Sequence, residues 1–395
     1  MRRRVGVWLF GARGSVATTT IAGAAALDHG APAAGVVTEL PDFSSAGLVP
    51  TDQLVFGGHD VVETPLSKQV ERLTAGGVLP AGLGTLITAE LAEAERNITL
   101  LPGNRNAAEG GDLPVGAVAH HPPDPQPGQF GVVRRMAEDI RAFRLRYDLE
   151  HVVAINVAST EAPYEVDVDS AAELRMALGE RDVLPPSSLG ALAAFEAGAA
   201  YMDFTPSTSI KPEAVREWAI EKGLPYGGQD AKTGETLVKS VLAPMFVHRA
   251  LPVHAWSGTN LLGGGDGATL ADPRAAESKG VSKERGLSEM LGDVAGEVHI
   301  DYVDPMGDWK TAWDHVVFSG FLGVRMTLQF TWQGCDSALA APLVLDLARL
   351  SALALERKHV GAMPFLGFYF KDPIESSEHA LARQYDALVR WVREC

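Results

Sequence analysis

Short apolar runs that end in turns and lead into helical segments organise the first half of this chain. Residues 5–10 form such a run, which ends at Gly11, and residues 18–27 are rich in alanine and threonine and predict a helix. The alternation continues with strands expected over 35–40, 54–60, 152–157 and 200–204 and helices over 133–147, 187–198 and 212–222. Repeated units of this kind predict an α/β fold with a doubly wound parallel sheet, which binds ligands beyond the carboxyl ends of its strands.

The turn after the first run, G-A-R-G-S-V-A, is a variant of the dinucleotide-binding fingerprint. Gly11, Gly14 and Ala17 are small residues at nearly the required spacing, and glycines allow a backbone to approach a pyrophosphate at a helix N-terminus. Arg13 occupies the usual position of the second glycine. Spacing alone therefore favours cofactor binding and a plain tight turn about equally.

Carboxylates follow the next two expected strands. Glu39 or Asp42 lies somewhat more than twenty residues after the turn, where a ribose-binding acid is expected, although acids are also common in surface loops. His59 and Asp60 end the run 54–60. Such a pair favours a hydrogen bond in a loop over a catalytic dyad.

The pattern changes after Gly228. Strands expected over 298–303 and 324–332 alternate with loops that carry lysine and aspartate, which predicts an antiparallel sheet in a second domain. A long apolar helix over 337–355 and an amphipathic helix at the end of the chain are expected to return to the first domain.

Composition excludes several classes of partner. The chain has 395 residues, 46% of them hydrophobic, and a formal net charge of -16, which argues against nucleic acid and requires a local cluster of cations for any anionic ligand. The sequence predicts no metal site, because His120 and His121 lack a third ligand. With only Cys335 and Cys395 present, we expect a reducing, cytoplasmic location.

No membrane association is expected. The basic and apolar first residues imitate a secretory signal, but Arg13 and a glycine turn interrupt them, so we interpret them as a buried strand. No stretch approaches the ~20 apolar residues of a membrane span.

Residues 260–283 suggest the chemistry. A glycine-rich loop with one carboxylate, Asp266, leads into a segment that places Lys279 and Lys283 four residues apart. In a helix these two side chains share a face. Two ammonium groups directed at one site predict an anionic substrate, which we interpret as a sugar phosphate.

Ordered motifs extend this observation over nearly the whole chain. They are F-G-G-H-D from Phe56, A-S-T-E from Ala158, P-S-S-L-G-A-L-A-A from Pro186, G-G-Q-D-A-K-T-G-E-T-L-V-K-S from Gly227, N-L-L-G-G-G-D-G from Asn260, S-K-G-V-S-K from Ser278, G-D-W-K from Gly307, C-D-S-A-L-A-A-P-L-V-L-D-L from Cys335 and F-K-D-P from Phe370. In this order they resemble the myo-inositol-1-phosphate synthases, also called inositol-3-phosphate synthases.

The resemblance implies an NAD-binding Rossmann domain built from both chain ends, with a central α+β domain inserted that carries catalytic lysines and a tetramer interface. We expect the bounds to be 1–235, 236–342 and 343–395. It also implies a redox-neutral cyclisation of glucose 6-phosphate: oxidation at C5, loss of a proton from C6, attack of the enolate on C1, and reduction of the cyclic ketone. The cofactor is regenerated, and the expected protein is a homotetramer.

The same resemblance assigns site residues. Lys371 is expected to transfer protons during oxidation and reduction, Lys279 and Lys310 to stabilise the enolate and aldol oxygens, and Lys283 to contact phosphate, while Asp230 and Asp266 orient lysines or lie near the nicotinamide. Ser278, Lys239 and Asp308 complete the expected substrate contacts. The expected cofactor contacts are Gly11, Arg13, Gly14, Ser15, Val16, Asp60, Ala158, Ser159, Thr160, Asp230, Gly265 and Asp266.

Several positions depart from the family pattern and leave the substrate open. The family has histidine at Leu261, asparagines at Gly264 and Gly265, asparagine at Ser159, serine at Trp309 and glutamate at Cys335. A homologue that converts fructose 6-phosphate to a five-membered carbocycle is the main alternative. A simple NAD-dependent dehydrogenase and a non-catalytic NAD-binding regulator are alternatives of other classes.

Overall fold

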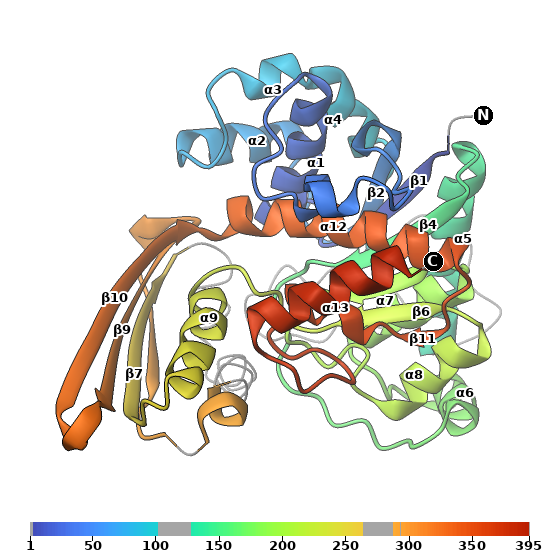
Figure 1. Ribbon diagram of the computed structural model, residues 1–395. Coiled ribbons are helices and arrows are strands. Elements are labelled where there is room, and N and C mark those ends of the chain that lie inside the picture. Colours follow the sequence, from blue (N-terminus) through green and yellow to red (C-terminus); the bar gives the residue numbers. More distant parts are fainter. Residues whose placement is uncertain (1–2, 102–127, 264–286, 293, 395) are drawn as a thin grey trace.

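Two sheets form the framework of the protein in the computed structural model, which describes residues 3–101, 128–263, 287–292 and 294–394 (Figure 1). The larger sheet has seven parallel strands in the order β11-β6-β5-β4-β1-β2-β3. The strands are β1 Val5–Phe10, β2 Leu54–Asp60, β3 Ile98–Leu100, β4 His151–Asn156, β5 Ala200–Asp203, β6 Pro225–Gly228 and β11 Gly361–Ala362. The order from β3 to β6 is that of a doubly wound dinucleotide-binding sheet, which confirms the predicted fold class.

The alternation of side chains along β1 separates two apolar cores. Val7 and Leu9 are buried in one core with α1 (Ser15–Asp28) and α12 (Asp336–Glu356). Trp8 and Phe10 are buried in the other, with α5 (Gln129–Arg146) and α7 (Pro186–Glu196). Burial on both faces explains why the strand sequence is apolar throughout.

Smaller helices extend both layers. They are α2 Leu66–Ala75, α3 Leu83–Leu86, α4 Thr88–Glu95, α6 Ala171–Glu180, α8 Glu213–Glu221 and α13 Leu381–Arg393.

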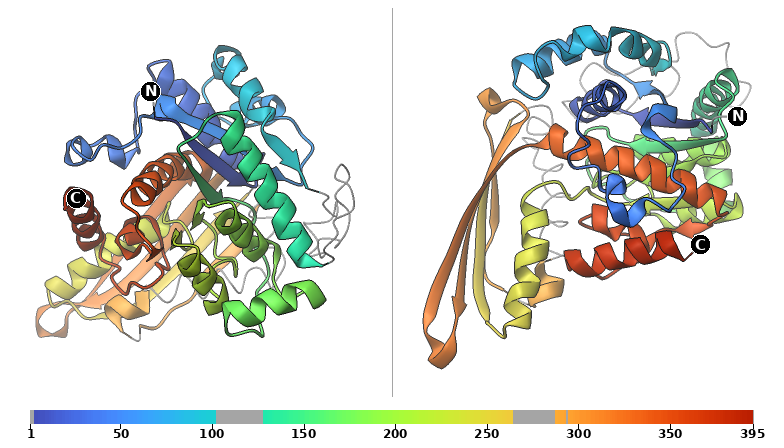
Figure 2. Two further views of the ribbon diagram at one scale, coloured as in Figure 1. Left: turned by 90° about the vertical axis from the view of Figure 1, so that its right-hand side faces the viewer. Right: turned by 45° about the horizontal axis from the view of Figure 1, so that its top comes forward.

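The second sheet has the strand order β10-β9-β7-β8 and stands apart from the first in Figure 1. Its strands are β7 Val253–Leu262, β8 Val298–Tyr302, β9 Trp309–Ser319 and β10 Arg325–Cys335. Helix α9 (Glu235–His248) covers one face, where Phe246 packs on Trp256 and Val316 (Figure 2). The expectation of an antiparallel sheet is only partly right, because β7 and β8 pair in parallel while β9 pairs antiparallel to both β7 and β10.

Helix α12 carries the chain from the second sheet back across the first. Among the described helices it alone is long and apolar enough to cross a membrane, with a mean hydropathy of 1.7, so the expectation that no stretch approaches this length is wrong. However, 72% of its apolar window is buried within the protein. These properties are those of a core helix.

The predicted strand over 35–40 is wrong. The chain instead forms two 3-10 helices, η1 Val37–Glu39 and η2 Pro41–Phe43. The Asp346 carboxylate of α12 accepts hydrogen bonds from the backbone N–H groups of Val37 and Thr38 at 2.9 and 3.0 Å. A side chain more than 300 residues away therefore takes the donors that a neighbouring strand would need.

Candidate active site

The turn between β1 and α1 packs against the turn after β4. Gly11 has a φ of +84°, and a Cβ atom there would lie 2.7 Å from the Cα of Ala158. Only glycine avoids both the strain and the clash. Ala158 begins the A-S-T-E motif, in which Thr160 is buried and Ser159 is exposed. Two motifs separated by 147 positions thus come together beside β1 and β4, where a dinucleotide-binding fold has its ligand crevice.

Asp60 connects the turns after β1 and β2. One carboxylate oxygen accepts from the backbone N–H of Arg13 at 2.6 Å, and the other accepts from that of Val62 at 2.7 Å. The Arg13 guanidinium donates to the Val62 carbonyl at 2.7 Å and pairs with Glu95. Asp60 ends β2 and therefore lies where a ribose-binding acid is expected in this fold.

The other candidate carboxylates have structural contacts. Glu39 pairs with Arg349 at 2.6 Å, and Asp42 accepts from the Tyr385 hydroxyl at 2.8 Å. Neither follows a strand, which removes the basis for expecting a ribose contact from them. His59 forms no dyad with Asp60, because its ring bonds Trp8 and Asp139, both at 3.0 Å.

The N-terminus of α1 meets the beginning of β9. Gly14 is the N-cap and gives no side-chain cap, Ser15 is the first helical residue, and Val16 follows. The Ser15 hydroxyl donates to Asp308 at 3.1 Å and lies 3.2 Å from an Arg72 nitrogen. The G-D-W-K motif of the second sheet therefore reaches the helix end where a pyrophosphate would bind.

The side chains of Trp309 and Lys310 point to opposite faces of the second sheet, as those of consecutive strand residues do. The Trp309 indole is exposed and donates to the Gly76 carbonyl at 3.0 Å. The departure from the family at this position therefore forms a contact between the second sheet and the end of α2.

Lys371 is held by Asp230. Its ammonium nitrogen is 2.7 Å from a carboxylate oxygen of Asp230, and its backbone N–H donates to the Asp230 carbonyl at 2.7 Å. The side chains are 10% and 5% exposed, so this ion pair is largely shielded from water. In turn, the backbone N–H of Asp230 donates to the Thr205 carbonyl just beyond β5, at 3.1 Å.

Lys310 of β9 contacts the same loop, residues 230–233, from the second sheet. Its ammonium nitrogen lies 2.5 Å from an Asp336 carboxylate oxygen and 3.4 Å from the Thr233 hydroxyl. Thr233 donates to Asp336 at 2.6 Å. Residues 230–233 between β6 and α9 therefore gather two lysines that are 61 positions apart in the sequence.

Lys239, an expected substrate contact, is paired within the protein. Its ammonium group bonds Glu235 and lies 3.4 Å from Asp314 and 5.8 Å from the centre of the Trp256 ring. Burial raises the pKa of Asp314 to about 6, although Lys239 opposes this shift. These contacts attach α9 to the second sheet.

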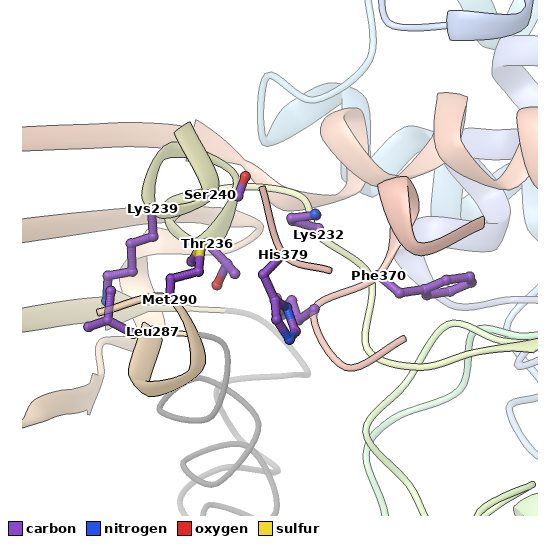
Figure 3. A pocket seen from close by; sticks show the side chains of 9 residues that line it. Lys232, Thr236, Lys239, Ser240, Leu287, Met290, Phe370 and His379 are labelled. Carbon is purple, nitrogen blue, oxygen red and sulfur yellow. The ribbon is translucent and has the colours of Figure 1, made fainter. Parts of the chain in front are cut away.

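Lys232 was not singled out from the sequence. It lines a small cavity with Lys371, Lys239 and His379, between α9 and the segment that follows η7 (Pro364–Tyr369) (Figure 3). Burial lowers its pKa to about 7, and its ammonium group donates to Gln384 of α13. The sequence places Lys232 between alanine and threonine in a glycine-rich motif, which is also typical of an exposed loop.

Several hydrogen-bond donors lie close to the N-terminus of α9. Gly234, the N-cap, has no side-chain cap, and a Cβ there would lie 3.2 Å from Trp332 Nε1 and 3.3 Å from Lys310 Nζ. Asn260 and Trp332 flank Ala312 in one row across the sheet. Within the described ranges, Trp332 Nε1 and Asn260 Nδ2 are buried without a hydrogen-bond partner.

The remaining predicted residues, Gly264, Gly265, Asp266, Ser278, Lys279 and Lys283, lie outside the described residues, as do His120 and His121. In the part of the chain that the structure describes, no three histidine, cysteine or acidic side chains gather in a group that could hold a metal ion.

Comparison with known proteins identifies the family. The family model of myo-inositol-1-phosphate synthase matches residues 35–393. This chain belongs to the myo-inositol-1-phosphate synthase family. The model is one of an NAD-binding family and indicates NAD as the cofactor.

Individual relatives agree with the family assignment. Inositol-3-phosphate synthase 1 of Bacteroides thetaiotaomicron is 34% identical over 276 residues, covering 67% of this chain and 64% of that protein. Inositol-3-phosphate synthase 1 of Bos taurus is 30% identical over 93% of this chain and 69% of its own length. The chain spans 64% of the length of the Bacteroides relative and the same share of a relative from Spirodela polyrhiza.

Solved structures show the same fold. Inositol-3-phosphate synthase of Caenorhabditis elegans has a TM-score of 0.86 at 23% identity, with 99% of this chain and 86% of that chain covered. A related protein of Thermotoga maritima has a TM-score of 0.75 at 23% identity and covers 99% of this chain and 98% of its own. The family fold thus extends over the whole chain.

Proposed function

We propose that this member of the myo-inositol-1-phosphate synthase family is an isomerase-type enzyme that cyclises a hexose 6-phosphate without net oxidation. The proposed reaction converts glucose 6-phosphate to myo-inositol 1-phosphate, also named 1D-myo-inositol 3-phosphate. One observation carries the proposal. Loop 230–233 gathers Lys310 and Lys371, each paired with a carboxylate, at the carboxyl edge of a parallel sheet of dinucleotide-binding topology.

The crevice beside β1 and β4 fits NAD. Gly11 leaves room for close backbone approach, and the uncapped start of α1 offers N–H groups to a pyrophosphate. When bound, NAD supplies a reversible acceptor for hydride. The residues proposed to hold it are Gly11, Arg13, Gly14, Ser15, Val16, Asp60, Ala158, Ser159, Thr160, Asp230, Gly265 and Asp266.

Lys371 is proposed to accept the proton of the sugar hydroxyl that is oxidised, as a neutral amine whose displaced proton passes to Asp230, and to return it on reduction. Asp230 fixes the position of the ammonium group at 2.7 Å, and the low exposure of the pair strengthens its electrostatic effect. Lys310 is proposed to stabilise the enolate and aldol oxygens, with Lys279 in the same role.

The substrate phosphate is proposed to lie at the start of α9. Lys310 Nζ and Trp332 Nε1 flank Gly234 there, and an indole nitrogen can only donate. An acceptor must therefore satisfy it, and an ammonium group beside a helix N-terminus favours an anionic one. Lys283, Ser278 and Asp308 are proposed as further contacts with the phosphorylated sugar.

We also propose that the protein is a cytoplasmic homotetramer. Its proposed domain bounds are 1–235, 236–342 and 343–395. The second sheet has one face that α9 covers, and its other face carries Trp313, which is 42% exposed. Light scattering on the purified protein tests the tetramer.

The substrate is tested by incubating the NAD-loaded protein separately with glucose 6-phosphate and fructose 6-phosphate and identifying any ring by NMR. We expect a six-membered ring from glucose 6-phosphate and no net change in absorbance at 340 nm. Turnover of fructose 6-phosphate alone would contradict the proposed substrate. Stoichiometric release of NADH would instead indicate a simple dehydrogenase.

A further inference from the structure

Asp203 forms the centre of a buried polar cluster at the end of β5. The residue is completely buried, and both of its carboxylate oxygens accept hydrogen bonds. Oδ1 accepts from the backbone N–H and the hydroxyl of Thr205, at 3.0 and 2.8 Å, and from Asn156 Nδ2 at 3.1 Å. Oδ2 accepts from Gln229 Nε2 at 2.6 Å. One acceptor group thus joins the ends of β4 and β5 to the segment that follows β6.

On one side, hydrogen bonds connect the cluster to the ion pair of Lys371 with Asp230. Gln229 and Asp372 exchange backbone hydrogen bonds of 2.8 and 3.2 Å, and they are the neighbours of Asp230 and Lys371 in the sequence. The carbonyl of Thr205 also accepts the backbone N–H of Asp230. Both chain segments that carry the ion pair are therefore fixed to groups that Asp203 orients.

On the other side, the cluster leads to the turn proposed to hold the cofactor. Asn156 donates to Asp203 through its amide nitrogen, while its amide oxygen accepts from the backbone N–H of Ala158 at 3.3 Å. Ala158 lies against Gly11 of the first turn. The amide of Asn156 thus connects Asp203 to the crevice beside β1 and β4.

We propose that Asp203 is a positioning residue, whose carboxylate fixes the Lys371–Asp230 pair relative to the turn that begins at Ala158. The inference rests on the proposed function, because that function requires Lys371 and the cofactor turn to hold a fixed position relative to each other. A carboxylate suits the position because it accepts hydrogen bonds on every side, whereas an asparagine would present an NH₂ group to one of the four donors. Displacement of a reacting group by about 1 Å can cost about 100-fold in rate.

The test measures the position of Lys371 without any substrate. Competitive labelling with acetic anhydride, read by mass spectrometry, gives the reactivity of each lysine in the full chain. In Asp203→Asn, the NH₂ group of the new asparagine faces the NH₂ group of Gln229, and two donors cannot form a hydrogen bond. We therefore expect the ion pair of Lys371 with Asp230 to loosen and Lys371 to be labelled about fivefold faster. In the double variant Asp203→Asn with Gln229→Glu, donor and acceptor are exchanged, and labelling of Lys371 should return toward the wild-type rate.

Asp346→Asn is the matched control. Asp346 is also completely buried and also accepts several hydrogen bonds, but its partners, Val37 and Thr38, lie on the other side of the sheet near α12. We expect this variant to lose stability without a change in the labelling of Lys371. If Asp203→Asn does not fold, Gln229→Met removes the same hydrogen bond and replaces it in the test.

Unchanged labelling of Lys371 in a folded Asp203→Asn protein, or in Gln229→Met, would overturn the inference. With an active protein, we also expect kcat to fall about 10- to 100-fold with little change in KM for the sugar phosphate. The two proposals fail separately. If neither hexose phosphate is turned over, the proposed function fails, while the labelling result still decides whether Asp203 positions Lys371.

Discussion

The carboxyl edge of the parallel sheet and the inner face of the second sheet differ in how many of their buried polar groups have hydrogen-bond partners within the protein. At the parallel sheet, the side chains of Asp60, Asp203 and Gln229 all have hydrogen-bond partners within the protein. On the second sheet, among the described residues, Asn260 Nδ2 and Trp332 Nε1 are buried with none. A buried donor without a partner costs about 1–3 kcal/mol. These three side chains of the first region are thus satisfied within the protein, while the second region has donors that a ligand can satisfy.

The largest effect is expected where the two regions meet, at Lys371. Lys371→Ala should lower turnover at least about 1000-fold, because it removes both a proton carrier and a positive charge from a shielded site. Product formation by NMR measures the effect, and circular dichroism checks the fold. Lys68→Ala, at an exposed lysine paired with Glu71, is the matched control and should leave turnover unchanged. An active Lys371→Ala protein would remove this lysine from the mechanism.

Two tryptophans test the comparison within the second sheet. Trp332→Phe removes a donor without a protein partner, so stability should change by less than about 0.5 kcal/mol, while binding of inorganic phosphate should weaken about tenfold. Trp256→Phe removes a donor that bonds Asp314 at 2.7 Å and should lower stability by about 1–3 kcal/mol. Urea unfolding and calorimetric titration separate the two effects. A stability loss in Trp332→Phe as large as that in Trp256→Phe would refute the distinction.

The last prediction concerns pH and a buried carboxylate of the parallel-sheet region. Burial raises the pKa of Asp346 to about 6 from 3.8, so the folded state binds a proton more tightly than the unfolded chain does. The stabilisation from this proton is full below pH 3.8 and is lost as pH rises through about 6. The stability difference between the wild type and Asp346→Asn should therefore shrink by about 2 kcal/mol between pH 4 and 6. Urea unfolding across this range measures it, and a constant difference would contradict the shift.

Local sequence patterns predicted the parallel sheet well. The run at β1, the glycine turn and α1 are adjacent in the chain, so their short-range pattern was sufficient. The segment at Val37 could not be predicted in this way, because its structure depends on Asp346. The parallel pairing of β7 with β8 likewise depends on a long connection and not on local pattern.

The predicted site residues remain predictions, but the structure shows where the described ones lie. The motifs identified Lys310 and Lys371, and the structure gathers both at loop 230–233. Lys232 was missed because only the fold reveals that it is buried. Asp203 was missed for a related reason, since a lone aspartate after a short strand acquires its partners, Asn156 and Gln229, from other strands. Neither role follows from spacing along the chain.

The late position of α12 in the chain has a consequence for synthesis. Its apolar residues pack against α1 and cover β4 and β5, although all three of these elements are synthesised long before α12. Until then, the growing chain carries a nucleotide-binding half with an uncovered apolar face, which is prone to aggregation. We therefore expect the growing chain to be most prone to aggregation in the interval before α12 is synthesised.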